Sequence, residues 1–172
     1  PYTTLFRSHE EPALSPTVLR PALAAGAAVG ASLALATAVS APLNFEVDPT
    51  HTFPSFEADH FGGMSVWRGK FNKTAGKVLL DRAAGSGSFD IVVEADSIDF
   101  GQEQLNGVAR GPQLFDVERF PQARYRGHLE AFVDGAPTRA VGDFTLHGVT
   151  RPLTMEIRQF QCRPHPLFKR EF

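Results

Sequence analysis

Residues 88–96 read Ser-Phe-Asp-Ile-Val-Val-Glu-Ala-Asp, and this stretch decides the fold class. Phe89, Ile91, Val93 and Ala95 alternate with mainly polar neighbours. Side chains of a β-strand point alternately to opposite faces of a sheet, so a period of two predicts a strand with one buried face. The chain shows no sustained 3.6-residue period of an amphipathic helix. The sequence therefore predicts an all-β protein.

The same alternation recurs on both sides of this strand. Seven further strands are predicted, at residues 45–48, 52–60, 67–71, 77–80, 124–129, 141–146 and 153–158. Glycine and proline clusters separate them, and Asp134-Gly135 is a hairpin turn signal. Residues 100–120 break the pattern, with a short helix predicted over 102–109 and a turn over 114–120. Eight short, regularly spaced strands predict an antiparallel sandwich or barrel, in which the helical insert would cap one end.

The apolar faces of these strands are the candidate ligand-binding surface. The interior of a barrel of about eight strands is either filled by side chains or just wide enough for a small ligand. Small residues at Ala58, Gly69, Ala95 and Gly127 favour some room. The predicted ligand-binding residues are Phe56, Ala58, His60, Phe71, Phe89, Ile91, Val93, Tyr125, Phe144, Leu146, Leu153 and Met155.

The composition is that of a globular domain and argues against nucleic-acid binding. The 172 residues are 42% hydrophobic and 21% charged, which is enough for one domain with a real core. The formal net charge of −2 leaves no basic surface for phosphates, so nucleic acid is not an expected partner.

The first 41 residues have the features of an export signal. Arg20 precedes an apolar run over residues 22–38, which ends in Ala36-Thr37-Ala38 and is followed by a second small-residue site at Ala41. A positive flank, an apolar centre and a small-x-small ending predict a signal peptide within residues 9–41. A membrane helix is the alternative, but the run is short of the about 20 strongly apolar residues that a span needs. Export would place the protein in an oxidising compartment.

Both ends of the chain carry unusual features. Residues 1–8 resemble the in-frame translation of a sequencing-adapter oligonucleotide, and we leave them out of the fold prediction. An ordinary N-terminal segment is the alternative reading. Cys162 is the one cysteine, and a single cysteine in an exported protein predicts a partner elsewhere.

No pattern of nucleophile and base is present, so we predict no enzyme and no cofactor. The sequence has no Gly-x-Ser-x-Gly motif and no phosphate-binding loop. His51 and His60 are nine residues apart and would meet only through a bulge or a bend, so we predict no metal site. Arg110, in the insert, could touch a polar head group or be an exposed surface arginine.

Six segments, in their order and spacing, resemble a known family. They are Phe45–Thr52, Phe56–Gly63, Arg68–Phe71, Ala95–Asp99, Arg110–Pro121 and Gly142–Leu153. Together they resemble the YceI-like family of periplasmic polyisoprenoid-binding proteins, from about Phe45 to Phe172.

The resemblance implies a lipocalin-like antiparallel barrel over residues 42–172 that holds the tail of an isoprenoid lipid, a polyprenyl phosphate or a quinone-like molecule. It implies a periplasmic carrier, storage or scavenger protein without catalytic residues. Residues 104–108 depart from the charged run expected there, which puts head-group contacts from this loop in doubt.

The resemblance also implies C-terminal strands beyond Phe172 and a second cysteine that would pair with Cys162. If those strands are absent, the open sheet edge predicts a homodimer or aggregation.

Two other functions stay open at this point. A stress-related or partner-binding barrel with a filled core is one. An enzyme or metalloprotein that uses His51 and His60 is the other, and it would require the two imidazoles to lie close together.

Overall fold

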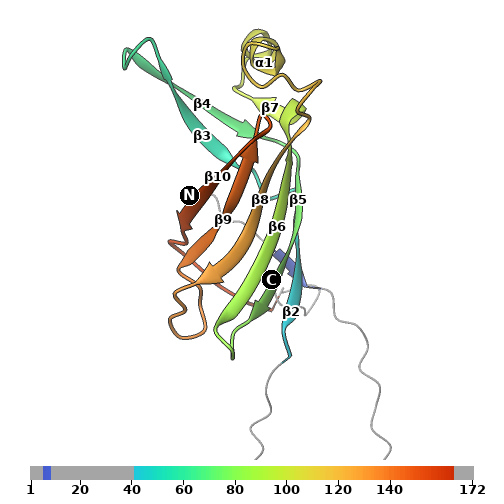
Figure 1. The fold of residues 1–172 in the computed structure, drawn as a ribbon, viewed down its shortest axis with the longest axis vertical. Helices are drawn as coiled ribbons and strands as arrows, with labels where there is room; N and C mark the ends of the chain where they lie inside the picture. The colour runs from blue at the N-terminus through green and yellow to red at the C-terminus, as the bar shows by residue number, and fades with distance from the viewer. Residues whose placement is uncertain (1–5, 9–40, 165–172) are drawn as a thin grey trace, which may run out of the picture.

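The computed structural model describes residues 6–8 and 41–164 (Figure 1). All of the predicted export signal except Ala41 lies outside the described residues. The described elements, in chain order, are β1 (Phe6–Ser8), β2 (Leu43–Val47), β3 (Ser55–His60), β4 (Ser65–Phe71), β5 (Thr74–Asp81), β6 (Ser86–Glu94), a 3-10 turn (Ala95–Ser97), β7 (Ile98–Asp99), α1 (Glu103–Arg110), β8 (Gln122–Glu130), β9 (Arg139–Leu146) and β10 (Val149–Glu156).

The strands form two antiparallel sheets. A seven-stranded sheet has the order β1-β2-β5-β6-β8-β9-β10, and a three-stranded sheet has the order β3-β4-β7. Figure 1 shows the larger sheet as a tall curved wall, with the β3–β4 hairpin leaning away from its upper end and α1 at that same end. The all-β prediction with a short helical insert is confirmed. Among the described residues, the two sheets do not close into a complete barrel.

Strand register separates an apolar inner face of the larger sheet from a polar outer face. One inner row crosses β2, β5, β6, β8, β9 and β10 through Phe45, Val78, Phe89, Gly127, Gly142 and Leu153. The next inner row holds Ile91, Tyr125, Phe144 and Arg151. The row between them on the outer face holds Glu46, Lys77, Asp90, Arg126, Asp143 and Pro152. The alternation in the sequence therefore identifies the two faces correctly.

Two packed clusters make up the core. The first joins β2, β5, β6, β8 and β9 through Phe45, Val78, Leu80, Phe89, Tyr125 and Ala140. The second lies towards the α1 end and contains Phe71, Val93, Ile98, Ala109 and Ala123. Burying a large apolar side chain contributes about 1.5–3 kcal/mol, so these clusters hold the sheet and the insert together.

Two tight turns have the backbone that their residues predict. Asp134 and Gly135 have φ values of 51° and 73°, and His147 and Gly148 have 51° and 72°. Two consecutive residues with positive φ form the hairpin turn whose twist matches that of the strands. The Asp134-Gly135 prediction is confirmed, since the bridge between Val133 and Ala136 encloses it.

Several element boundaries differ from the prediction. β3 begins at Ser55 rather than at residue 52, because Pro54 has no N–H to donate to a ladder. β5 begins at Thr74 rather than at residue 77, and the end of the central strand tightens into the 3-10 turn at Ala95. Phe6–Ser8, which we left out of the fold prediction, pair with β2 as β1. That residues 1–8 are translated from a sequencing adapter stays a prediction.

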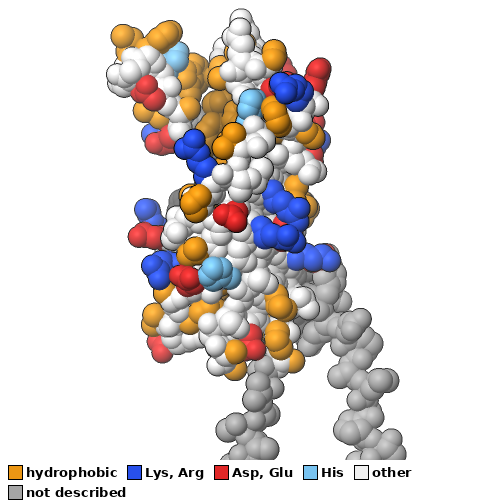
Figure 2. Space-filling model, in the orientation of Figure 1, with side chains coloured by type: hydrophobic (Ala, Val, Ile, Leu, Met, Phe, Trp, Pro, Cys, Tyr) orange, Lys and Arg blue, Asp and Glu red, His pale blue; other side chains and the backbone are white. Residues whose placement is uncertain are grey.

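Side-chain types are unevenly spread over the surface. Figure 2 shows charged and hydrophobic side chains mixed over the visible face, with hydrophobic side chains gathered at the end of the β3–β4 hairpin. In the described part of the chain, no helix is long and apolar enough to span a bilayer.

Candidate functional site

The predicted ligand-binding residues occupy the inner faces of both sheets, with different degrees of exposure. Phe71, Phe89, Val93 and Tyr125 are buried. Seven others are half-buried: Phe56, Ala58, His60, Ile91, Phe144, Leu146 and Leu153. Met155, on β10, is 45% exposed. The inner face is therefore closed over β5 and β6 and partly open over β9 and β10.

Tyr125 fastens the open side of this face. Its hydroxyl oxygen lies 2.8 Å from the carbonyl oxygen of Ala140 and 3.0 Å from that of Leu153, and its single hydrogen is shared between these two acceptors. Its ring lies 4.6 Å from that of Phe89, centroid to centroid. Burial raises the pKa of Tyr125, so the phenol stays protonated and keeps donating at neutral pH. This one side chain ties β8, β9 and β10 together beneath the half-buried surface.

A chain of aromatic rings connects the β3–β4 hairpin to the second core cluster. His60 lies 5.6 Å from Trp67, and Trp67 lies 6.5 Å from Phe100, between ring centroids. Phe56 continues the chain, 5.5 Å from both Phe100 and Phe71. We call His60, Trp67, Phe100, Phe56 and Phe71 the aromatic track.

Phe100 and Phe115 are members of this region that the sequence patterns missed. Phe115 packs 5.8 Å from Phe71 and 6.2 Å from Phe56. Both residues come from the irregular segment 100–120, where no strand or helix period marks an inward position. Their high hydrophobicity inside a polar segment is the only local signal.

The small residues Ala58, Gly69, Ala95 and Gly127 predicted free space inside the protein. This prediction is wrong at three of the four positions. A methyl group on Gly69 would meet Phe56 at 2.7 Å and Phe100 at 2.9 Å. One on Gly127 would meet Val141 O and would lie 2.6 Å from the Cα of Gly142. Ala95 is buried in the 3-10 turn. Glycine in a strand here admits a close neighbour instead of leaving a space.

Two buried hydroxyl groups lack a partner. The side-chain oxygens of Thr52 and Thr74 make no hydrogen bond within the described ranges. Thr74 lies in the same inner row as Val93 and Ala123. An unsatisfied buried hydroxyl costs about 1–3 kcal/mol, so the inner face offers polar atoms beside its apolar ones.

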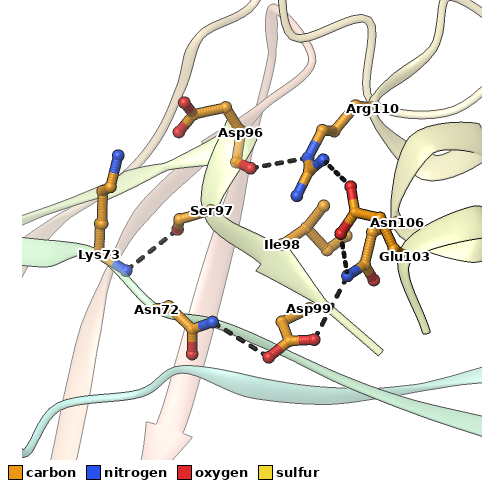
Figure 3. A pocket seen from close by; sticks show the side chains of 9 residues that line it. All are labelled: Asn72, Lys73, Asp96, Ser97, Ile98, Asp99, Glu103, Asn106 and Arg110. Atoms are coloured by element: carbon orange, nitrogen blue, oxygen red, sulfur yellow. Dashed lines mark hydrogen bonds and ion pairs between the residues drawn. The ribbon is translucent and has the colours of Figure 1, made fainter. Parts of the chain in front are cut away.

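A polar pocket of about 390 Å³ lies where α1 meets β7 (Figure 3). Its lining residues are Asn72, Lys73, Asp96, Ser97, Ile98, Asp99, Glu103, Asn106 and Arg110. The side chains and backbone groups mostly bond to one another. Asp99 accepts hydrogen bonds from the Gly101 amide (2.7 Å), Asn72 (3.1 Å) and Asn106 (3.3 Å). These bonds, that of the Gly101 amide first, hold the pKa of Asp99 below its usual value.

Arg110 lies in this pocket and has internal partners. Its Nε donates to the carbonyl oxygen of Asp96, and its guanidinium pairs with Glu103, both at 2.9 Å. Figure 3 shows it bridging the strand segment and the helix. The arrangement makes Arg110 a tie between α1 and the sheet. These two bonds use two of the five N–H groups of the guanidinium.

The two candidate metal-binding histidines have separate local partners. His51 Nδ1 lies 2.9 Å from Asp48, in the turn after β2. His60 Nδ1 lies 2.8 Å from Ser65, across the β3–β4 hairpin. Across residues 6–8 and 41–164, no group of three or more His, Cys, Asp or Glu side chains could hold a metal ion. Cys162 is half-buried and packs against the first core cluster.

Comparison with known proteins adds the family. A family model described as the YceI-like domain matches residues 45–170. The chain belongs to this family. A UPF0312 protein of Yersinia pestis (strain Pestoides F) is 29% identical over 133 residues, which cover 76% of this chain and 68% of the relative.

Solved structures align with this YceI-like chain at low sequence identity, and the Campylobacter jejuni structure among them shares its fold. The YCEI protein of Campylobacter jejuni aligns with a TM-score of 0.52 and 15% identity over 66% of each chain. BcnA of Burkholderia cenocepacia aligns at 0.48 with 22% identity, over 59% of this chain and 63% of that one. A polyisoprenoid-binding domain from Saccharophagus degradans aligns at 0.38 with 17% identity, over 66% and 60%. The chain thus spans slightly less than two thirds of these solved proteins.

Proposed function

We propose that this YceI-like chain binds the tail of a long isoprenoid lipid, of polyprenyl or quinone type, against the inner face of its sheets. It acts without catalysis, as a carrier, store or scavenger. The export features of residues 20–41 favour the periplasm as its location.

The half-buried apolar surface of β9 and β10 carries this proposal. Phe144, Leu146 and Leu153 face inwards yet stay partly exposed, and Met155 beside them is 45% exposed. A tail that covers such a surface gains about 0.8 kcal/mol per buried CH₂, or roughly 4 kcal/mol per five-carbon unit before ordering costs. A few units are enough for micromolar binding, which needs about −8 kcal/mol.

Selectivity should depend on the tail more than on the head group. Three charged groups of the polar pocket already have partners there, since Arg110 pairs with Glu103 and Asp99 accepts a hydrogen bond from Asn72. Its lining holds three carboxylates against one lysine and one arginine. This excess of carboxylates does not favour a phosphate. The protein should therefore select its ligand by the length and width of the tail.

A partner-binding protein with a filled core is the second candidate. The filled position at Gly69 favours it, since the rings of Phe56 and Phe100 occupy the space that a tail would need there. The two candidates differ in whether purified protein holds lipid.

Two tryptophan substitutions on neighbouring residues of β10 test the proposal. Leu153 faces inwards with Gly142, and Thr154 lies on the opposite face with Val141. Leu153→Trp should fill the proposed site and reduce bound lipid at least tenfold, while Thr154→Trp should leave it unchanged. The measurement is mass spectrometry of organic extracts of protein purified from a periplasm without detergent.

Equal lipid content in the two variants would place the lipid elsewhere. Wild-type protein that stays free of lipid after exposure to polyprenols and quinones would favour the filled-core protein.

A further inference from the structure

The β3–β4 hairpin ends in an exposed apolar turn. Phe61 is 76% exposed, Met64 81% and Val66 51%. Residues 61–66 read Phe-Gly-Gly-Met-Ser-Val and contain no charged side chain. We call this turn the hairpin tip. It stands clear of the larger sheet in Figure 1, and hydrophobic atoms cover much of its end in Figure 2.

The hairpin tip is built to stay in this conformation. Asp59 accepts hydrogen bonds from the amides of Gly62 (2.9 Å) and Gly63 (2.6 Å). The hydrogen bond between His60 and Ser65 closes the base of the turn. A flexible loop loses conformational entropy when it binds, whereas a preformed turn does not. The exposed side chains of the hairpin tip can therefore bind a partner without this loss.

Other exposed apolar residues share this end of the molecule. Val108 on α1 and Leu114 after it are 57% and 54% exposed, and Val149 begins β10 beside the same end. Figure 1 places α1, the start of β10 and the hairpin tip at one end. Scattered exposed apolar residues are ordinary, whereas their concentration at one end marks a contact surface.

The hairpin tip is also continuous with the inner face. Phe61 lies 4.1 Å from His60, which begins the aromatic track to Phe56 and Phe71. An apolar molecule could follow this track from the tip to the second core cluster without crossing a charged surface. A protein partner has no need of such a path, but a lipid that leaves a bilayer does.

We propose that the hairpin tip inserts into the surface of a lipid bilayer and that lipid enters the protein along the aromatic track. The loading step rests on the proposed function, but docking does not. The tip has no charged side chain of its own, and the Asp59 carboxylate beside it accepts hydrogen bonds from the Gly62 and Gly63 amides. Insertion is therefore apolar, and anionic lipid should not strengthen it.

Vesicle binding of matched variants tests the docking. The chain should co-sediment with neutral phosphatidylcholine vesicles, equally at low and high salt. The double variant Phe61→Ser/Met64→Ser should bind about 100-fold more weakly, roughly tenfold per apolar side chain. Val133→Ser is the control, since Val133 is 60% exposed at the opposite end, in the β8–β9 turn. Trp67 is the single tryptophan, and its emission should shift to the blue when wild type docks.

Lipid content separates this proposal from the proposed function. The double variant should still hold lipid supplied from solvent but should take it up slowly from vesicles. Leu153→Trp should dock normally and hold little lipid. Met64→Ser alone, which leaves Phe61 and its left-handed backbone unchanged, serves if the double variant does not fold.

Three results would overturn the docking proposal. The first is a wild-type chain that does not sediment with vesicles, and the second is a Val133→Ser variant that binds as weakly as the double variant. Self-association that requires Phe61 and Met64, without vesicle binding, would instead assign the hairpin tip to a second copy of this chain.

Discussion

Single glycines set how closely the strands of the larger sheet approach each other. Gly127 and Gly142 face each other across β8 and β9 in the inner row that also holds Phe89. A methyl group on Gly127 would lie 2.6 Å from the Cα of Gly142, so backbone would have to move. At this position the absence of a side chain is a packing requirement, although the sequence suggests an empty space.

Gly127→Ala should therefore destabilise the protein by about 1–3 kcal/mol or more, as overpacking against rigid neighbours does. Gly107→Ala is the matched control. Gly107 lies in α1 with nothing within 4 Å of the added methyl, so alanine should be neutral or stabilise by about 0.5–1 kcal/mol. Urea unfolding of both variants measures the difference. Equal stability would mean that β8 and β9 can separate without cost.

At the scale of elements, local patterns predict the strands and the short helix of the insert, which is expected over 102–109 and spans Glu103–Arg110, but not which insert residues point inwards. Period-two alternation identifies β6 and the inner faces of β8 and β9, because each strand carries its own signal. The polar pocket joins residues 72–73, 96–99 and 103–110, which become neighbours only after the sheets pair. Phe100 and Phe115 were missed for the same reason. Their inward direction is set by tertiary packing, not by a local repeat.

The link between α1 and β7 should depend on pH through Asp99. Its pKa is lower in the folded chain than in the unfolded one, so its contribution to stability is full at neutral pH. That contribution declines as the pH falls below about 4, towards the folded pKa. Asp99→Asn should thus lower the urea midpoint at pH 7, and the gap to wild type should narrow in acid.

Hydrogen exchange of the α1 amides should show the same trend, because Asn106 of that helix bonds to Asp99. If the urea midpoints of wild type and Asp99→Asn differ by the same amount at pH 7 and at pH 3, the charge of the Asp99 carboxylate contributes nothing to holding α1.

At the scale of the whole molecule, the two sheets carry different surfaces. The larger sheet buries its inner face over β5 and β6 and leaves it half-buried over β9 and β10. The smaller sheet carries the hairpin tip and the aromatic track that leads inwards. The hairpin tip is thus apolar and exposed, while the outer face of the larger sheet carries ion pairs such as Arg124 with Asp90. The proposed function needs both features, since a lipid must enter from a bilayer and then be covered.

Bound lipid should stabilise the whole chain by linkage, because only the folded protein presents the inner face. At a free lipid concentration 100 times the Kd, the added stability is about 2.7 kcal/mol. In a chain of 172 residues each kcal/mol shifts Tm by about 2–4 °C, so loading should raise Tm by roughly 5–10 °C. Scanning calorimetry of delipidated and reloaded protein measures the shift, with Thr154→Trp matching wild type and Leu153→Trp showing little change. If delipidated and reloaded wild-type protein have the same Tm, the half-buried surface of β9 and β10 is not where a tail binds.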